Sequence, residues 1–314
     1  MDINILLALQ SFREGAGSIF TEFMTKMSWF GEMNIVLVIM GLIYWCANKE
    51  TGTYLLMGWS GNRTVNGILK VSVCTYRPWI RDARIIPDAA AKASATGYSF
   101  PSGHSMNGAS LYGGLAIRRR IRAGLRALCW IIVALIAFSR IFLCVHTPQD
   151  ILVGTGAGIL VMFLTGKLLK WVEAHPKKDI LVALIGIVIA GAAAVYAALK
   201  PYPTDYDAAG NLLVDGLKMA NDTFKAVGWL GAFMAGWVLE RRFVGFSTEV
   251  TMQRRFLRLT GGLLGYYVIY LIISPLIKTA VAGFAGTVIT CFLQMFYITF
   301  LFPVIMKVTE RGKQ

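Results

Sequence analysis

Residues 124–170 have the sequence GLRALCWIIVALIAFSRIFLCVHTPQDILVGTGAGILVMFLTGKLLK. Two apolar blocks, 124–144 and 149–170, are each about 20 residues long, and a short polar segment separates them. A helix of about 20 apolar residues is long enough to cross the ~30 Å hydrocarbon core of a bilayer. The stretch therefore predicts two consecutive transmembrane helices joined by a tight loop.

The rest of the chain is also rich in apolar residues. Of its 314 residues, 56% are hydrophobic and only 15% are charged, whereas soluble domains usually carry about 25% charged residues. We expect an all-α, polytopic transmembrane helical bundle of about nine spans, a six-helix core followed by three C-terminal helices. The expected spans are 33–47, 53–73, 104–118, 124–144, 149–170, 180–199, 224–239, 259–277 and 280–306.

Four segments are expected along the chain. Residues 1–26 have no basic stretch and no small-residue cleavage site, so we interpret them as a retained amphipathic segment at the membrane interface. Residues 27–200 form the six-helix core, and 201–223 an acidic extracytoplasmic loop. Residues 224–314 form the three-helix extension, where small residues are spaced for close helix contact.

The net charge of +14 follows the expected loops. With the N-terminus outside, 18 of the 31 Lys and Arg residues lie on the inner side and 12 on the outer side, with Arg63 inside a span. This asymmetry predicts an integral membrane protein with the N-terminus outside and the C-terminus cytoplasmic. The compact loops favour a bacterial plasma membrane. A basic balance distributed in this way does not indicate nucleic-acid binding. The five cysteines are scattered without a C-x-x-C pair, which argues against a zinc or disulfide framework.

A glycine-rich run, Gly154-Thr-Gly-Ala-Gly158, has two interpretations. It could be a nucleotide-binding loop, but such loops follow a strand, and this run lies inside an apolar block. Close packing of one helix on another is therefore the favoured interpretation.

Three short polar blocks are not explained by the bilayer. They are Lys70-x6-Arg77-Pro78, Pro101-Ser102-Gly103-His104 and Ser139-Arg140-x5-His146-x3-Asp150. Because spans 104–118 and 124–144 cross the membrane and return, all three blocks should emerge on the same outer face. His175, the remaining histidine, lies in a Lys-rich inner loop and is expected to be solvated.

Together the three blocks have the composition of an anion site. Lys70, Arg77 and Arg140 provide three cations, and the arginine fork matches phosphate oxygens. Ser102 and Gly103 begin a helix, whose backbone N–H groups favour an anion.

The histidines provide reactive groups beside these cations. His146 precedes Thr147-Pro148, a typical helix start, and Asp150 could hold one nitrogen of the His146 ring while the other attacks phosphorus. His104 could protonate the leaving oxygen. Singly, these residues have simpler explanations, such as an acid at a helix start for Asp150. Those explanations do not predict that all of them meet on one face.

The three blocks resemble the signature of the type-2 phosphatidic acid phosphatase superfamily, which also includes glucose-6-phosphatases and vanadium haloperoxidases. The resemblance covers about residues 30–200 and leaves the last three spans unexplained. It implies a phosphatase that forms a phosphohistidine and needs no metal or other cofactor. It also implies site roles: His146 as nucleophile, Asp150 as its orienting group, His104 as acid and then base, and Lys70, Arg77, Ser102, Gly103 and Arg140 as phosphate ligands.

Arg63 and Asn66 precede Lys70 on the same helix. A charged residue inside a membrane span is often functional. We consider two roles for Arg63 equally: with Asn66 it lines the floor of the substrate pocket, or it pairs with a helix-end carbonyl.

Several functions remain open. The leading hypothesis is a lipid phosphatase acting on a lipid phosphate or pyrophosphate in the outer leaflet, with the bilayer as its environment; bacterial members of the superfamily act on undecaprenyl pyrophosphate and phosphatidylglycerophosphate. Alternatives with related chemistry are a glucose-6-phosphatase-like hydrolase of a soluble sugar phosphate and a lipid phosphotransferase. A transporter or channel is a fourth hypothesis, but ion pathways do not require two histidines beside three phosphate-binding cations.

Overall fold

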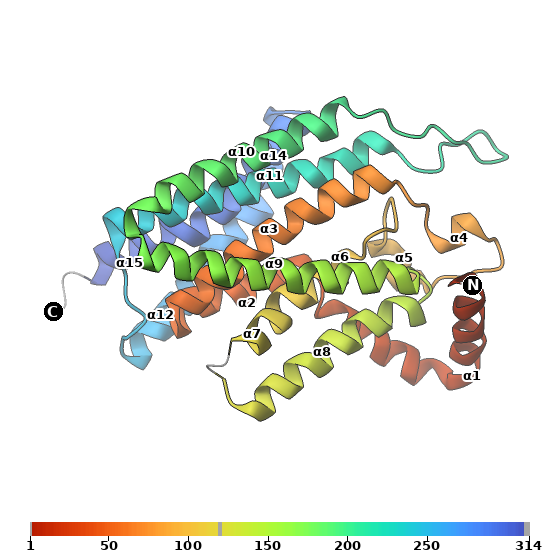
Figure 1. The fold of residues 1–314 in the computed structure, drawn as a ribbon, viewed down its shortest axis with the longest axis horizontal. Coiled ribbons are helices and arrows are strands. Elements are labelled where there is room, and N and C mark those ends of the chain that lie inside the picture. The colour runs from red at the N-terminus through yellow and green to blue at the C-terminus, as the bar shows by residue number, and fades with distance from the viewer. Residues whose placement is uncertain (1, 119–120, 311–314) are drawn as a thin grey trace. The chain divides into compact units, whose positions relative to one another are not determined.

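The computed structural model describes residues 2–118 and 121–310 (Figure 1). Within these ranges the chain is helical, with loops and one isolated backbone bridge between Tyr206 and Leu212, and it contains no strand. The predicted all-α class is confirmed. The basic residues at 119, 120, 311 and 313, which contribute to the charge asymmetry, lie outside the described residues.

All nine predicted blocks are helical. The α-helices are α1 (Asp2–Trp29), α2 (Met33–Leu42), α3 (Lys49–Val73), α4 (Pro78–Arg81), α5 (Ala89–Ser94), α6 (Gly103–Gly108), α7 (Gly114–Ile117), α8 (Ala123–Phe142), α9 (Pro148–Ala174), α10 (Asp179–Leu199), α11 (Gly216–Leu239), α12 (Met252–Val268), α13 (Ser274–Ala280), α14 (Gly283–Phe296) and α15 (Phe302–Glu310). Short π-helical turns continue or join several of them, namely η1 (Ile43–Ala47), η2 (Ala109–Gly113), η4 (Glu240–Val244), η5 (Ile269–Ile273) and η6 (Tyr297–Leu301), and η3 (Pro176–Lys178) is a 3₁₀ turn.

Fewer than nine helices have the length and composition of a membrane span. In the described part of the chain, five helical segments are long and apolar enough to cross a bilayer, or six if the pair α1 and α2–η1, bent by 53°, forms one span. The five segments are 123–142, 148–174, 176–199, 252–280 and 283–310. The protein is therefore an integral membrane protein, but nine spans are not confirmed. Of the other predicted spans, α3 and α11 carry several polar and charged residues, and α6–α7 is short.

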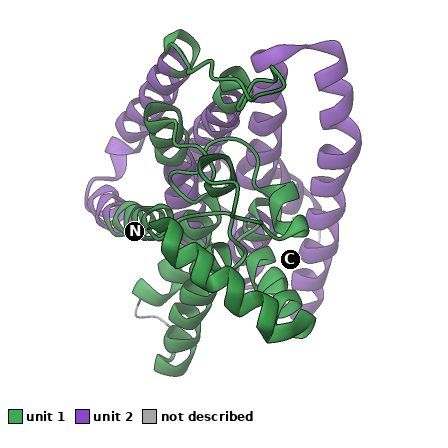
Figure 2. Ribbon diagram, turned by 90° about the vertical axis from the view of Figure 1, so that its right-hand side faces the viewer, with its two compact units in different colours: residues 1–36, 65–163, 197–220 green, residues 37–64, 164–196, 221–314 purple. Residues whose placement is uncertain are grey.

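The chain forms two compact units (Figure 2). Unit 1 contains residues 1–36, 65–163 and 197–220, and unit 2 contains 37–64, 164–196 and 221–314. Both α3 and α9 contribute residues to each unit. The predicted segment boundaries, at 26, 200 and 223, stay a prediction.

In unit 1, α1 packs along α8. The ring of Phe20 meets that of Phe142 edge-on, with centroids 5.2 Å apart, and Leu6 is fully buried beside Cys144. Arg13 donates hydrogen bonds to the carbonyl oxygens of Ile86 (2.6 Å) and Phe142 (3.5 Å). These contacts fix α1 against the C-terminal end of α8, where the third polar block begins.

Unit 2 is stabilised by buried aromatic and ionic contacts. Trp45 Nε1 donates to the carbonyl oxygen of Ile298 (2.8 Å), and Lys49 pairs with the buried Glu240 (2.6 Å). Gly228 lies so close to the backbone of Val288 that a Cβ atom at this position would clash with it. The predicted close helix contact through small residues is confirmed in this unit.

The glycines of α9 support the packing interpretation of Gly154–Gly158. An added Cβ at Gly154 would lie 2.8 Å from the carbonyl oxygen of Ser102, and one at Gly158 would lie 2.7 Å from the Ala109 side chain. The run is inside a continuous helix and has no strand before it. Gly154 therefore lets α9 approach the turn that carries the second polar block.

We expect Gly154→Ala to destabilise the protein, because the methyl group would push Ser102 away from α9. Overpacking of this kind costs about 1–3 kcal/mol, which should appear as a lower unfolding midpoint in mixed detergent micelles. Gly156→Ala is the matched control, because an added Cβ there meets nothing within 4 Å. Equal midpoints for the two variants would contradict the packing role of Gly154.

Candidate active site

The loop between α8 and α9 turns the chain sharply. Cys144 adopts a left-handed conformation (φ 57°), and the N–H groups of Val145 and His146 both donate to the carbonyl oxygen of Arg140 (3.1 and 3.2 Å). Orphan carbonyls at a helix end are commonly satisfied in this way. The turn places His146 beside the end of the helix that carries Arg140, so two residues of the third block are joined by backbone geometry.

Thr147 and Asp150 form a reciprocal cap at the start of α9. The Thr147 N–H donates to Asp150 Oδ2 (2.8 Å), and the Asp150 N–H donates to Thr147 Oγ1 (3.4 Å). Asp150 Oδ2 also lies 3.2 Å from His146 Nδ1. The carboxylate therefore stabilises the helix start and contacts the histidine at the same time.

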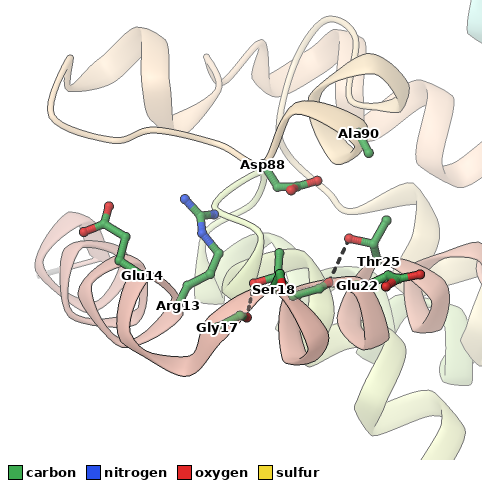
Figure 3. Close-up of a pocket in the computed structure, with 9 residues that line it drawn as sticks. Arg13, Glu14, Gly17, Ser18, Glu22, Thr25, Asp88 and Ala90 are labelled. Atoms are coloured by element: carbon green, nitrogen blue, oxygen red, sulfur yellow. Dashed lines mark hydrogen bonds between the residues drawn. The ribbon is translucent and has the colours of Figure 1, made fainter.

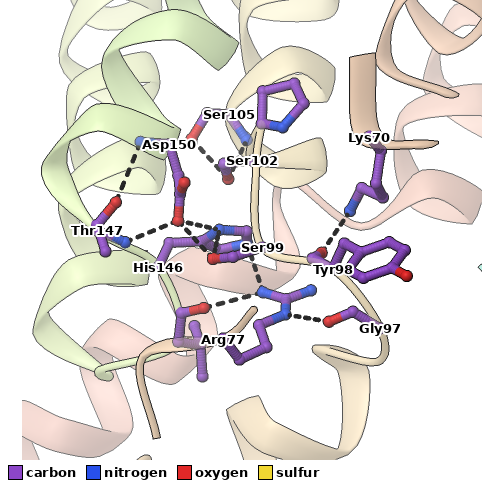
Figure 4. Close-up of polar contacts among 12 residues, drawn as sticks. Lys70, Arg77, Gly97, Tyr98, Ser99, Ser102, Ser105, His146, Thr147 and Asp150 are labelled. Carbon is purple, nitrogen blue, oxygen red and sulfur yellow. Dashed lines mark hydrogen bonds and ion pairs between the residues drawn. The ribbon is translucent and has the colours of Figure 1, made fainter. Parts of the chain in front are cut away.

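The hydrogen bonds of His146 determine which ring nitrogen carries the proton (Figure 4). Arg77 Nη1 lies 2.9 Å from His146 Nε2. Because a guanidinium can only donate, Nε2 must be the acceptor. The proton of the neutral ring is then on Nδ1 and is donated to Asp150, which leaves the Nε2 lone pair facing the cation.

The surroundings of His146 also favour its neutral form. The side chain is only 2% exposed, and burial, followed by the charge of Arg77, lowers the pKa of His146 well below 6.5. Asp150 opposes this effect without reversing it. His146 is therefore an unprotonated imidazole at neutral pH.

The cations of the first block hold the loop that precedes α6. Lys70 Nζ donates to the carbonyl oxygen of Tyr98 (3.2 Å). Arg77 donates from Nε to the carbonyl oxygen of Gly97 (3.0 Å) and from Nη2 to that of Thr96 (3.1 Å). The positions of Lys70 and Arg77 are thereby fixed before any ligand binds.

Ser99 is a site residue that the sequence did not reveal. Its hydroxyl donates a short hydrogen bond to Asp150 Oδ2 and lies 3.4 Å from His146 Nδ1. Ser99 is fully buried, and its N–H donates to the carbonyl oxygen of Thr75 (2.7 Å). A single serine in a loop carries no sequence signal for such a contact.

Ser102 lies at the start of α6, as predicted, and its side chain caps the helix, but its backbone N–H already has a partner. The hydroxyl of Ser102 accepts from the Ser105 N–H (3.4 Å) and from the Ser105 hydroxyl (3.0 Å). The Ser102 N–H donates to the carbonyl oxygen of Asp150 (3.0 Å). Gly103 is the first residue of the helix. Of the two backbone N–H groups predicted to bind an anion, that of Ser102 is therefore occupied by Asp150, and that of Gly103 remains the candidate donor.

His104 has a partner that the sequence did not suggest. His104 Nε2 lies 3.2 Å from Glu32 Oε1, and the side chains are 14% and 38% exposed. The charges of Arg140 and Arg77 act on the His104 ring and on the His146 ring alike. The second and third blocks therefore meet around the same two arginines, as the topology predicted.

Arg140 is a buried cation of the site, and some of its hydrogen-bond donors lack an acceptor. Its side chain is fully buried, and Nη1 donates a short hydrogen bond to the hydroxyl of Ser28. Nε and Nη2 have no hydrogen-bond partner among the described residues. Buried donors of a charged group are costly to leave unpaired, so this pair of nitrogens fits an anion with oxygen acceptors.

Arg63 and Asn66 have separate surroundings. Asn66 Nδ2 donates to the carbonyl oxygen of Pro101 (3.3 Å) and contacts the sulfur of Met106 (3.2 Å), so it holds the second block against α3. Arg63 belongs to unit 2, where Asp222 is the acidic residue whose charge acts on it. A place for either residue in a substrate pocket stays a prediction.

Comparisons with known proteins identify the family of the chain. Residues 51–174 match the family model of the PAP2 superfamily, and residues 224–312 match that of the PAP2 superfamily phosphatase transmembrane extension. The chain belongs to the PAP2 superfamily. The extension match also accounts for the three C-terminal helical segments, which the motifs left unexplained.

One curated relative is a phosphatidylglycerophosphatase B of Bacillus subtilis (strain 168), 28% identical over 155 residues, which cover 46% of this chain and 72% of the relative. No solved structure matches the chain. Together the matches identify a PAP2-family membrane phosphatase related to phosphatidylglycerophosphatase.

No group of three or more His, Cys, Asp or Glu side chains that could hold a metal ion occurs within residues 2–118 and 121–310. All five cysteines are free thiols. That catalysis proceeds without a metal stays a prediction.

We expect Ser99→Ala to lower kcat by about 10-fold, the lower end of what comparable supporting partners contribute in metal sites. The loss follows because Asp150 would no longer be held by the hydroxyl while it contacts His146. Ser94→Ala is the control, because the Ser94 hydroxyl donates to the carbonyl oxygen of Ala91 in its own helix. Steady-state phosphate release measures both; an unchanged kcat in Ser99→Ala would contradict the positioning role.

Proposed function

We propose that the protein hydrolyses a lipid phosphate or pyrophosphate through a phosphohistidine on His146. The observation that carries the proposal is the state of this side chain: a buried, neutral imidazole whose Nδ1 is held by Asp150 and whose Nε2 lone pair faces a guanidinium. An oriented imidazole of this kind is an activated nucleophile.

In the first step, substrate binding frees the nucleophile. A phosphate oxygen is a stronger acceptor for Arg77 than a neutral imidazole is, because it carries charge. The Nη1 hydrogen of Arg77 that faces Nε2 would therefore be donated to a phosphate oxygen instead, while Nη1 keeps its hydrogen bond to the carbonyl oxygen of Val145, and Nε2 would attack phosphorus. The Nδ1–H bond to Asp150 stabilises the positive charge that develops on the ring.

The leaving oxygen departs on the side opposite His146, because attacking and leaving groups are in line in phosphoryl transfer. His104 would protonate that oxygen as the bond from phosphorus to the leaving group breaks. Burial and the charge of Arg140 lower the pKa of His104 to about 4, and Glu32 opposes this only in part, so the ring is neutral before substrate binds. The negative charge of the bound phosphate would raise this pKa and favour the protonated ring that the step needs. Glu32 occupies Nε2, so Nδ1 is the nitrogen that would serve the substrate. Water then attacks the phosphohistidine, His104 takes a proton from the water, and phosphate is released.

Fixed cations would neutralise the phosphoryl oxygens. The two unpartnered nitrogens of Arg140 offer a fork for two oxygens, and Lys70 and Arg77 add two more charges. Preorganised donors in a buried site stabilise charge that develops in the transition state. We infer that these residues hold the phosphate and that no metal is required.

The substrate is proposed to be an amphiphile because apolar surface lies next to the catalytic residues. Leu152, two residues after Asp150 in α9, is 69% exposed, and Leu160 farther along the helix is 56% exposed. A lipid tail could lie along this face while its phosphate enters the site. The name of the Bacillus relative favours a lipid over a sugar phosphate. From the charge asymmetry we place the site on the extracytoplasmic face of the membrane.

We expect His146→Ala to reduce turnover by about 10³-fold, because the covalent route is lost. Purified protein should be mixed with ³²P-labelled lipid phosphate in the presence of EDTA and quenched in alkali, in which phosphohistidine is stable. Wild type should retain the label, and His146→Ala should not. His175→Ala is the matched control, since this exposed histidine directly follows α9 and its Nδ1 lies 2.9 Å from the carbonyl oxygen of Trp171.

Two outcomes would reject this mechanism. Near-normal turnover of His146→Ala would exclude the phosphohistidine, and complete loss of wild-type activity in EDTA, restored by a divalent cation, would exclude metal-independent hydrolysis.

We expect phosphoenzyme formation to continue as the pH falls from 7.5 through 6.5. The pKa of His146 is lowered from 6.5, so the ring stays neutral and nucleophilic below the pH at which a free histidine is protonated. Arg77→Gln removes a charge that lowers this pKa, so the acid loss of activity should move to higher pH. Rapid-quench rates, corrected for substrate ionisation measured by ³¹P NMR, test this. An acid limb at the same pH in both proteins would contradict it.

A further inference from the structure

A pocket of about 470 Å³ lies beside α1 in unit 1, and Figure 3 shows Asp88 facing α1 across it. The carboxylates of Glu14, Glu22 and Asp88 line this pocket together with the guanidinium of Arg13. Arg13 already donates to two backbone carbonyls. A lining with this balance of charge repels a phosphate. A surplus of cations outside the candidate active site occurs instead in unit 2.

The first of these cations, Arg63, lies where α3 packs against α11. The rings of Trp59 and Trp229 join the two helices, with centroids 5.0 Å apart. Arg63 follows Trp59 by one helical turn, and Lys225 precedes Trp229 by one turn. Asp222, another turn back, is near enough to Arg63 for their charges to interact. The helices therefore run in opposite directions, and Arg63 and Lys225 lie on the same side of the tryptophan contact.

Two glycines bring α13 and α14 to the same region. An added Cβ at Gly228, one turn after Lys225, would lie 3.0 Å from the Cβ atom of Cys291 in α14. An added Cβ at Gly286, also in α14, would lie 3.6 Å from the Cα atom of Lys278 in α13. Cys291 therefore borders α11, and Lys278 borders the start of α14.

Arg63, Lys225 and Lys278 form what we call the unit 2 cation cluster. The charges of all three act on the thiol of Cys291, which lies among them. Asp222 is the carboxylate that meets this cluster, and its Oδ1 pairs with Lys225 Nζ at 2.7 Å. Three cations against one carboxylate leave a surplus of two positive charges.

The cluster also contains buried donors that lack an acceptor. Arg63 Nε and Trp229 Nε1 are buried and have no hydrogen-bond partner in the described part of the chain. Both groups can donate but cannot accept, and a buried donor without an acceptor is destabilising. An anion with oxygen acceptors would satisfy these donors and balance the surplus charge.

The position of the cluster along the chain indicates the source of the anion. Lys278 lies two residues before the end of segment 252–280, and α14 begins segment 283–310; both segments are long and apolar enough to cross a bilayer. Cations at the ends of such segments meet lipid headgroups. Leu276 and Ile289, on the same two segments, are 64% and 44% exposed. Acyl chains can therefore cover apolar surface beside the cations.

We propose that the unit 2 cation cluster binds the phosphate of an anionic phospholipid from the surrounding bilayer. The phosphate accepts from Arg63 and pairs with Lys278, while Lys225 keeps its bond to Asp222 and adds its charge. The acyl chains lie along α13 and α14. This lipid is a ligand that stabilises the folded protein, and no bond in it is broken. The residues of the site belong to unit 2, whereas the proposed catalytic residues belong to unit 1.

The test measures thermal unfolding in mixed micelles that contain phosphatidylmethanol or phosphatidylcholine with the same acyl chains. Phosphatidylmethanol is a phosphodiester with a single negative charge, and phosphatidylcholine is zwitterionic. A lipid that binds the folded state raises the unfolding midpoint as its concentration rises. The midpoint of the wild type should rise with phosphatidylmethanol and stay constant with phosphatidylcholine. Equal responses to the two lipids would overturn the proposal.

Arg63→Gln/Lys278→Gln removes two cations and leaves the Lys225–Asp222 pair in place. The apparent affinity for phosphatidylmethanol should fall about 5-fold per cation, or about 25-fold in this variant. The midpoint in phosphatidylcholine should stay near that of the wild type. A lower midpoint in phosphatidylcholine with unchanged affinity for phosphatidylmethanol would show a structural role and overturn the proposal. Lys278→Gln alone changes an exposed side chain, so it tests the 5-fold loss even if the double variant does not fold.

The matched control is Lys177→Gln/Lys178→Gln, which removes two exposed cations from η3 of the same unit. This variant should keep the wild-type affinity. A 25-fold loss here as well would show general attraction of a basic protein to anionic micelles and overturn the assignment to the cluster.

Two further arms identify the ligand and the site. Dimethyl phosphate has the same anionic group without acyl chains and should leave the midpoint unchanged at the same concentration; an equal rise would overturn the assignment to a lipid. Arg140→Gln should keep the wild-type affinity for phosphatidylmethanol. Loss of affinity in Arg140→Gln would place the lipid in the candidate active site and overturn the proposal. Normal turnover of His146→Ala would reject the phosphohistidine and leave this inference unaffected.

Discussion

The hydrogen bond from Arg77 to His146 is the interaction on which the site depends. It joins the first polar block to the third, and it fixes the tautomer of the imidazole because arginine cannot accept. Asp150 completes the arrangement from the other side of the ring. A neutral histidine held between a cation and an anion cannot rotate without losing one hydrogen bond, so the ring is oriented before substrate binds.

Burying several cations in one place requires compensation, and the backbone supplies much of it. Lys70 and Arg77 donate to the carbonyls of Gly97 and Tyr98 and their neighbours, which orders a loop that has no regular structure. Arg140 is the exception, since two of its nitrogens stay unpaired. A desolvated cation with open donors is destabilising by itself, and a phosphate would remove that penalty. The least satisfied side chain is therefore the strongest sign of where the anion binds.

The sequence predicted the features of the fold and the site that depend on a local pattern of residues. The nine helical blocks, the cap at Thr147 and the packing role of Gly154 follow from periodicity, turn chemistry and residue size. It did not predict Ser99 or Glu32, whose partners are 51 and 72 residues away, because an isolated polar residue has no pattern. Nine spans are not confirmed, because a helix such as α3 is long enough to cross a bilayer but too polar to be recognised as a span by composition.

The two sides of the proposed reaction are built from different parts of the chain. The nucleophile, its orienting acid and the cations lie within residues 51–174, the segment that matches the PAP2 family. Ser28 and Glu32, which contact Arg140 and His104, lie before it. If His104 protonates the leaving oxygen, the nucleophile is encoded in the matched segment, and the partner of the general acid lies outside it.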